Sequence, residues 1–163
     1  MGRYLFLLIL IILASCGEQD ILEGRAKAVD GDSLVLNNVI NIRLWGIDAP
    51  EYRQNCQKDG RNITCGLMAK AHLQSLIKGQ KITCEQKDID QYERIVAICK
   101  NSQDVELNKE MVQSGWAIDY TRYSYGKYRI TEYKAKQQNL GIWQYVFEFP
   151  SIWRKVNKGK LRK

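Results

Sequence analysis

Three short runs of β-forming residues follow one another between residues 25 and 45. They occupy residues 25–29, 33–36 and 39–45. The connecting residues, 30–32 and 37–38, are Asp, Gly and Asn, which form tight turns. In the third run apolar and polar side chains alternate, so one face of this strand enters a core while Arg43 points from the other face. The part of the chain that follows residue 23 therefore begins with consecutive short strands.

Later segments combine helical and β patterns. Apolar residues at helical spacing predict helices at 66–78, 105–114 and 130–139, and a glycine lies close behind each. Two further strands are predicted around 81–86 and 94–100. The chain of 163 residues shows no internal repeat and no low-complexity linker. The sequence thus predicts one α+β domain, a small five-stranded β-barrel with three helices.

Residues 1–16 have the layout of an export signal. One early cation, Arg3, precedes an apolar run at 4–12 that is too short for a comfortable membrane span. The following Leu-Ala-Ser-Cys resembles a bacterial lipobox, in which the cysteine thiol receives a diacylglyceryl group. We therefore expect a signal peptide at 1–15, a tether at 16–23, and an exported chain anchored to the bacterial cell envelope through lipidated Cys16. A plain signal peptide with an accidental cysteine is the alternative.

Four cysteines remain once Cys16 is set aside, an even number that suits disulfides in an oxidising compartment. Three pairings are possible. Cys84 and Cys99 lie in two β-like runs separated by a polar turn, and neighbouring antiparallel strands would bring them together. This leaves Cys56 to pair with Cys65 across a small loop. A four-cysteine zinc site is the alternative, but the spacings lack any C-x-x-C pair.

The positive charge of the chain is concentrated at its C-terminal end. Seven of the 25 basic residues are Arg3 and the six in the acid-free segment 154–163, so the remaining 18 balance the 18 acidic residues. We interpret 154–163 as a basic C-terminal tail. Net charge is therefore a poor argument for nucleic-acid binding, and any phosphate site has to be built from locally placed arginines.

Charged clusters lie at the ends of predicted elements. They are VDGDS at 29–33, RLWGIDAPE at 43–51 and DQYER at 90–94. Each alone is typical of an ordinary turn or loop. Together, in this order, and with a matching helix region at 107–117, they resemble the staphylococcal-nuclease-like (thermonuclease) family. The resemblance implies an OB-fold barrel for a domain at 24–153, and the paired cysteines and the C-terminal segment resemble the exported bacterial branch of the family.

The resemblance implies a metal site and a cofactor. Asp32 and Asp48 match the carboxylates that hold a single Ca²⁺, and the backbone carbonyl of Ala49 matches a third protein ligand. Oxygen ligands from loops suit a hard cation with flexible coordination. Ala49 stands where the best-known member of the family has threonine, but a backbone carbonyl is available from any residue.

The resemblance also implies the chemistry. Arg43 and Arg94 match the two arginines that clamp the scissile phosphate, and Glu51 matches the carboxylate that orients or deprotonates the attacking water. The implied reaction is hydrolysis of DNA and RNA to leave 3′-phosphate ends. Glu93 precedes Arg94 where glycine is usual, so we expect a shifted turn and a shifted aim of Arg94.

Tyrosines at Tyr120, Tyr123 and Tyr125 lie where the family places tyrosines beside the nucleotide base. Stacking on unpaired bases would favour single-stranded substrate. The alternative is that this Tyr-rich loop packs on the barrel.

The leading hypothesis is a monomeric, Ca²⁺-dependent nuclease that acts on DNA and RNA. A noncatalytic module that binds nucleic acid or protein is the main alternative, because family domains that lack the charged site residues serve in that way. A third alternative is a structural envelope lipoprotein, which would neither bind nor cleave nucleic acid.

Overall fold

The computed structural model describes residues 20–157. The predicted signal peptide at 1–15, the lipidated Cys16 and the last residues of the predicted tail, 158–163, lie outside the described residues. Within residues 20–157, no helix has both the length and the apolar character needed to cross a bilayer.

The main sheet has six strands in the spatial order β1-β8-β9-β4-β3-β2. They are β1 (Ile21–Gly24), β2 (Ala26–Ala28), β3 (Ser33–Leu36), β4 (Ile40–Leu44), β8 (Ile82–Ile89) and β9 (Ile95–Asn101). The β4–β9 pair is parallel and the other pairs are antiparallel. All five predicted strands are present, within three residues of the predicted ends.

The predicted closed, five-stranded barrel is wrong for the described residues. β1 adds a sixth strand, which pairs with β8 from Ile21 to Gly24 within the segment that the sequence assigns partly to a tether. β1 and β2 then form the two edges of the sheet, which stays open. The sequence pattern identifies strands but says little about whether edge strands meet, because edge pairing depends on how far the whole sheet curls.

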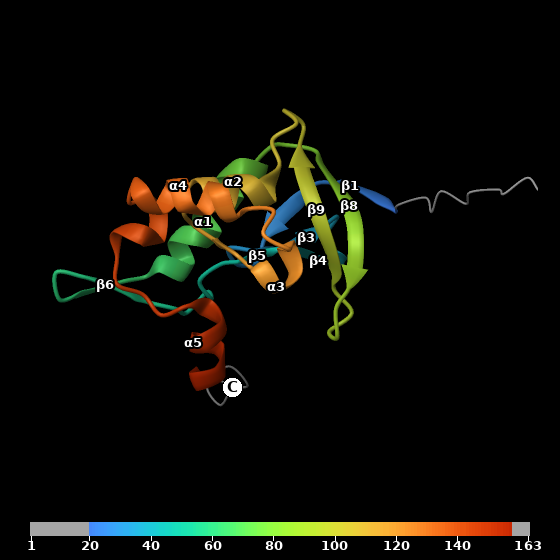
Figure 1. Ribbon diagram of the computed structural model, residues 1–163. Coiled ribbons are helices and arrows are strands. Elements are labelled where there is room, and N and C mark those ends of the chain that lie inside the picture. Colours follow the sequence, from blue (N-terminus) through green and yellow to red (C-terminus); the bar gives the residue numbers. More distant parts are fainter. Residues whose placement is uncertain (1–19, 158–163) are drawn as a thin grey trace, which may run out of the picture.

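Two small ribbons accompany the main sheet. β5 (Ile47–Asp48) pairs with β10 (Ile118–Asp119), and β6 (Cys56–Lys58) pairs with β7 (Arg61–Ile63). The β6–β7 hairpin extends away from the sheet beyond the helices (Figure 1). The sequence predicts neither ribbon, because strands of two or three residues carry too little alternation to be recognised.

Five α-helices and one 3₁₀-helix lie in the described part of the chain. They are α1 (Cys65–Ile77), α2 (Leu107–Gln113), α3 (Thr121–Ser124), α4 (Arg129–Gln137), η1 (Gly141–Gln144) and α5 (Pro150–Asn157). The three predicted helices correspond to α1, α2 and α4, with ends within two residues. The count of three is too low because α3 is a single turn and α5 lies largely in residues with a basic, tail-like composition.

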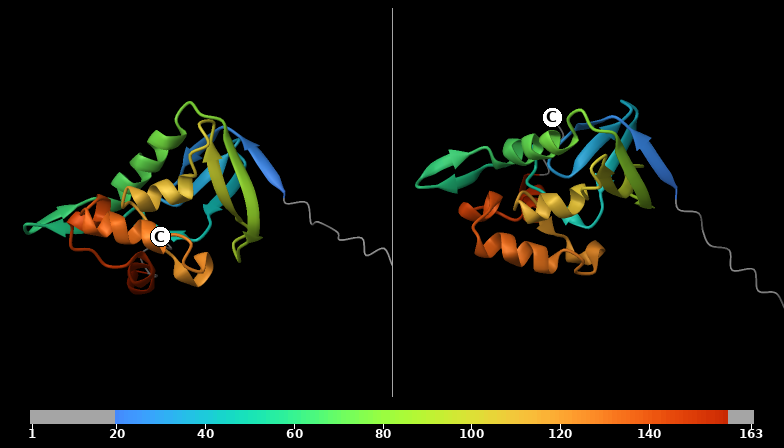
Figure 2. Two further views of the ribbon diagram at one scale, coloured as in Figure 1. Left: turned by 45° about the horizontal axis from the view of Figure 1, so that its top comes forward. Right: turned by 90° about the horizontal axis from the view of Figure 1, so that it is seen from above.

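The hydrophobic core lies between the sheet and the helices, which gather on one side of it (Figure 2). Leu34 and Ile42 from the sheet, Leu73 from α1, and Met111 from α2 are all fully buried there. The alternation predicted for β4 is confirmed, since Ile42 and Leu44 are buried while Arg43 is partly exposed on the opposite face.

Both predicted disulfides are present, which removes these four thiols from any zinc site. Cys84 and Cys99 are directly paired residues of β8 and β9. Cys56 of β6 is bonded to Cys65, the first residue of α1. The second bridge therefore holds the base of the β6–β7 hairpin against the start of α1.

Candidate active site

A cleft of about 890 Å³ lies beside the outer face of β4 and the tip of the β8–β9 hairpin. Four arginines line it, from four different elements or loops: Arg43, Arg94, Arg122 and Arg154. Three tyrosines line it as well: Tyr92, Tyr120 and Tyr123. Four carboxylates line it too, Asp30, Glu51, Asp88 and Asp90, so the arginines offer local contacts to phosphate groups rather than a net positive groove.

The strand register brings the first site residues together. Ser33 of β3 pairs with Arg43 of β4, so Asp32, immediately before Ser33, lies beside the arginine. The backbone carbonyl of Asp32 accepts a hydrogen bond of 2.8 Å from the N–H of Leu44, which fixes this end of the hairpin. Asp48 follows on β5, which β10 holds in place through the pairing of Asp48 with Ile118. Regular strand geometry therefore positions the carboxylates.

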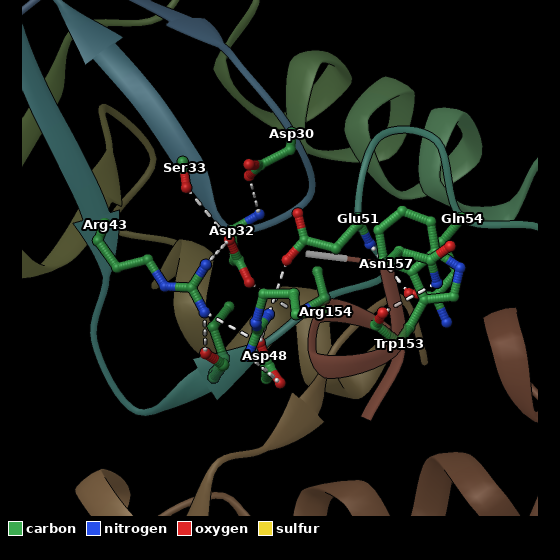
Figure 3. A network of polar contacts seen from close by, with 12 residues as sticks. Asp30, Asp32, Ser33, Arg43, Asp48, Glu51, Gln54, Trp153, Arg154 and Asn157 are labelled. Atoms are coloured by element: carbon green, nitrogen blue, oxygen red, sulfur yellow. Dashed lines mark hydrogen bonds and ion pairs between the residues drawn. The ribbon is translucent and has the colours of Figure 1, made fainter. Parts of the chain in front are cut away.

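Arg43 bridges two buried carboxylates. Its Nη1 donates to Oδ1 of Asp32, and its Nη2 donates to Oδ1 of Asp48 at 3.0 Å (Figure 3). The backbone N–H of Ala49 donates to the other oxygen of Asp32 at 2.8 Å. Burial raises the pKa of Asp32 well above its usual value, the charge of Arg43 opposes this rise, and the charges of Asp30 and Asp48 add to it. Burial is the larger of these effects, so the pKa of Asp32 stays raised despite the contact with Arg43.

Arg154 brings a second guanidinium to Asp48 from α5, 106 residues further along the chain. Its Nη1 donates to Oδ1 of Asp48 at 2.8 Å and to Oε1 of Glu51 at 2.7 Å, and its Nη2 donates to Oδ2 of Asp48 at 3.1 Å (Figure 3). Partial burial lowers the pKa of Arg154, but hydrogen bonds and charge from Asp48 and Glu51 outweigh burial and raise it above its usual value.

Sequence reasoning missed Arg154 as a site residue because the sequence assigns it to a basic tail. Pro150 is a typical first residue of a helix and could have indicated α5. No local signal indicates that the helix places Arg154 on Asp48, because that contact depends on the path of the chain after α4.

Arg94 lines the cleft but is held by its own hairpin. Its Nε and Nη2 donate to Oδ2 of Asp90 at 2.8 and 2.7 Å, and its guanidinium lies 5.6 Å from the ring centre of Tyr92. Glu93 occupies the left-handed region with φ of +61°, the conformation that a glycine would adopt there. The structure therefore groups Asp32, Arg43, Asp48 and Ala49 with Glu51, whereas Arg94 lines the same cleft and is bonded to Asp90 instead.

The three tyrosines predicted to stack on a nucleotide base differ in whether they line the cleft. The rings of Tyr120 and Tyr123 lie 5.1 Å apart and both line the cleft. The guanidinium of Arg122 lies 5.7 Å from the ring centre of Tyr123. Arg122 was not predicted from the sequence as a site residue. Tyr125 is 87% exposed and does not line the cleft.

The residues present fit a hard cation in donor type. Asp32 and Asp48 offer carboxylate oxygens beside the backbone of Ala49, and Ca²⁺ commonly completes its coordination with backbone and water oxygens. In residues 20–157, no group of three or more Asp, Glu, His or Cys side chains is arranged to hold a metal ion. A cation at this site would therefore depend on two carboxylates together with non-side-chain oxygens.

Comparison with known families gives a match that covers most of the domain. The family described as staphylococcal nuclease homologue matches residues 41–145. This range includes Arg43, Asp48, Glu51 and Arg94, and it ends before α5.

Comparison with curated proteins gives relatives at about 30% identity. The chain is 28% identical to the succinoglycan biosynthesis protein ExoI of Rhizobium meliloti, over 83% of this chain and 71% of the relative. It is 30% identical to an uncharacterized endonuclease of Haemophilus influenzae, over 93% of this chain and 83% of the relative. It is 32% identical to a micrococcal nuclease of Shigella flexneri, over 81% of this chain and 79% of the relative.

Proposed function

Because this chain belongs to the staphylococcal nuclease family, we propose that it is a Ca²⁺-dependent nuclease that hydrolyses phosphodiester bonds in DNA and RNA and leaves 3′-phosphate ends. The relatives named as endonuclease and micrococcal nuclease support a nuclease. The observation that carries the proposal is the arrangement of Arg43 between buried Asp32 and Asp48, with Glu51 beside them, in a cleft lined by four arginines.

The arginines stabilise the charge that develops on the phosphate. In-line attack on a phosphodiester adds negative charge to its nonbridging oxygens in the transition state, and fixed positive groups lower the free energy of that state. The planar guanidinium of Arg43 presents several donors, and its buried carboxylate partners fix its orientation. Arg94 faces the same cleft from the β8–β9 hairpin. A Ca²⁺ ion held by Asp32, Asp48 and the carbonyl of Ala49 would add Lewis-acid stabilisation of the same charge.

Glu51 is the group that accepts a proton from water. Its side chain lines the cleft and is 22% exposed, so water reaches it. Oε1 accepts the hydrogen bond from Arg154, and within the described residues Oε2 has no hydrogen-bond partner. The free oxygen can therefore orient and deprotonate a water molecule that attacks the phosphorus.

The side chains of the cleft also favour one class of nucleic-acid substrate. Contacts from arginine to phosphate carry no base information, so we expect cleavage that tolerates many sequences. Tyr120 and Tyr123 offer aromatic surfaces to unpaired bases, which favours single-stranded or frayed substrate.

Digestion of single-stranded DNA by the full chain, with Ca²⁺ or with excess chelator, tests this function. We expect Glu51→Gln to slow cleavage by about 10²–10⁴-fold, because general-base catalysis contributes about that much. Glu110→Gln, a matched charge removal on α2 outside the cleft, is expected to cleave at the wild-type rate. Cleavage at the same rate with and without chelator, or full activity in Glu51→Gln, contradicts the mechanism. Binding without cleavage would identify the noncatalytic module instead.

We propose in addition that the protein is an exported monomer anchored to the bacterial cell envelope through Cys16. The two disulfides support an oxidising compartment. Fractionation of cells that produce wild-type protein or Cys16→Ser tests the anchor. We expect the wild type in the membrane fraction and the variant outside it, and equal membrane content of the two rules out lipidation at Cys16.

A further inference from the structure

Arg154 fills the position at Asp48 that a cation would need. Its guanidinium engages both oxygens of Asp48, at 2.8 and 3.1 Å, and one oxygen of Glu51 at 2.7 Å (Figure 3). The side chain of Asp48 is fully buried, so its negative charge has to be balanced by groups within the protein. Arg43 and Arg154 supply this balance.

A divalent cation and Arg154 compete directly for this carboxylate, because Arg154 engages both oxygens of Asp48 whereas Arg43 engages only Oδ1. Ca²⁺ binds carboxylate oxygens at about 2.3–2.6 Å, so an ion on Asp48 would lie within a few ångströms of the guanidinium. Both groups are positive, and repulsion between them is strong where the surroundings exclude water. Binding of the ion would also use the lone pairs that Arg154 now occupies.

Helix α5 is attached to the rest of the protein by little buried apolar surface. Within α5, only Pro150 is buried, while Ile152 and Val156 are exposed. Arg154 therefore makes the main polar attachment of this eight-residue helix to the site. The loss of that attachment removes little buried apolar surface, so release of the helix costs little free energy.

We propose that α5 is a built-in closure of the site, in which Arg154 holds the position of the cation until Ca²⁺ displaces it. This inference rests on the Ca²⁺ dependence put forward under the proposed function. In the cation-free protein, Arg154 neutralises Asp48 and restrains Glu51. When the ion binds Asp48, Arg154 withdraws and α5 loosens, so cation binding and opening of the site are one coupled event.

Titration of the full chain with Ca²⁺ alone, by calorimetry, tests the competition. Arg154→Gln removes the competing charge and is expected to tighten Ca²⁺ binding by about tenfold, which lies within the usual range of coupling between sites. Lys155→Gln removes the same charge from the neighbouring, exposed position of α5 and is the matched control. We expect its Ca²⁺ affinity to stay within about twofold of wild type, because exposed charges are screened by salt. Equal affinities for the two variants, or weaker binding in Arg154→Gln, overturn the proposal.

Hydrogen exchange of the wild-type protein provides a second readout that needs no variant. We expect the amides of α5 to lose protection when Ca²⁺ is added, since the helix is released. Unchanged or increased protection of α5 in a protein that binds Ca²⁺ overturns the closure.

The two proposals fail in different ways. If Arg154→Gln binds Ca²⁺ more tightly but no form of the protein cleaves nucleic acid, the closure stands and the nuclease is refuted. If the protein is a Ca²⁺-dependent nuclease whose two variants bind Ca²⁺ alike, only the closure is refuted. If no variant binds Ca²⁺, the closure and the Ca²⁺ dependence are both refuted.

Discussion

Glu93 is the most strained residue of the β8–β9 hairpin tip. Its φ of +61° lies in the left-handed region, which costs most non-glycine residues about 1–2 kcal/mol. The turn around it is closed by Asp90, whose Oδ1 accepts backbone N–H bonds from Tyr92 and Arg94 at 2.9 and 3.0 Å. These bonds keep the turn in the shape that a glycine would allow, and they hold Arg94 at the cleft.

Replacement of Glu93 by a residue that tolerates the left-handed region is expected to stabilise the protein. Asn is such a residue, so Glu93→Asn should raise the free energy of unfolding by about 1 kcal/mol. Urea denaturation followed by circular dichroism measures this change. Glu93→Gln keeps the strain and removes the charge, so its stability should stay within about 0.5 kcal/mol of wild type. A stability gain in Glu93→Gln that equals that in Glu93→Asn would show that charge, rather than backbone strain, limits stability.

One hairpin that carries a residue of the cleft is fastened by a disulfide. The Cys84–Cys99 bridge closes a sequence separation of 15 residues across β8 and β9, whose hairpin tip bears Arg94. In the chain-entropy model a loop of this length stabilises the fold by about 3 kcal/mol. The Cys56–Cys65 bridge closes a shorter separation of nine residues and contributes somewhat less. The hairpin that bears Arg94 is therefore covalently restrained, whereas the Cys56–Cys65 bridge lies outside the residues that line the cleft.

Helix α5 differs from these elements in how it is attached. The β8–β9 hairpin is held by a ladder, a disulfide and the core, whereas α5 buries only Pro150 and depends on the ion pairs of Arg154. Elements with little buried apolar surface open most easily, because local stability follows local burial. Because of this difference, α5 is the element that we propose to close and open the site. The sheet holds the residues of the site that stay fixed.

The positive charge of the cleft is local rather than net, because its four arginines are matched by Asp30, Glu51, Asp88 and Asp90. The full chain has a net charge of +7, but the excess comes mainly from the C-terminal end. The four arginines of the cleft come from β4, the β8–β9 hairpin, α3 and α5. Phosphate recognition in this cleft therefore depends on contacts from individual arginines.

The contribution of a single cleft arginine to DNA binding can be measured from the salt dependence of the affinity. We expect the affinity of the full chain for single-stranded DNA, measured in chelator to prevent cleavage, to fall linearly with the logarithm of salt concentration. Arg122→Gln should reduce the slope by about 0.7, the value for one lost phosphate contact on a single strand. Arg129→Gln removes the same charge outside the cleft and should leave the slope unchanged. Equal slopes for all three proteins would mean that Arg122 does not touch phosphate.

Much of the fold was predictable because its signals are local. The alternation in β4 and the apolar spacing in α1, α2 and α4 follow from which residues face the core, and each pattern spans enough residues to be recognised. The open sheet, the short ribbons and the position of α5 against the site were not predictable. They depend on edge pairing, on strands of two or three residues, and on the direction of the chain after η1.

The sequence by itself determined five strands of the main sheet, the helices α1, α2 and α4, the pairing of the cysteines and the residue types of the site. These properties follow from turn chemistry, from side-chain periodicity, and from motifs such as the one between Arg43 and Glu51, whose members are close neighbours in the chain. Only the tertiary structure decided that Arg122 lines the cleft and that Arg154 binds Asp48. The physical reason is that a contact across 106 residues depends on the path of every element between its two ends, and neither residue carries a local pattern that records it.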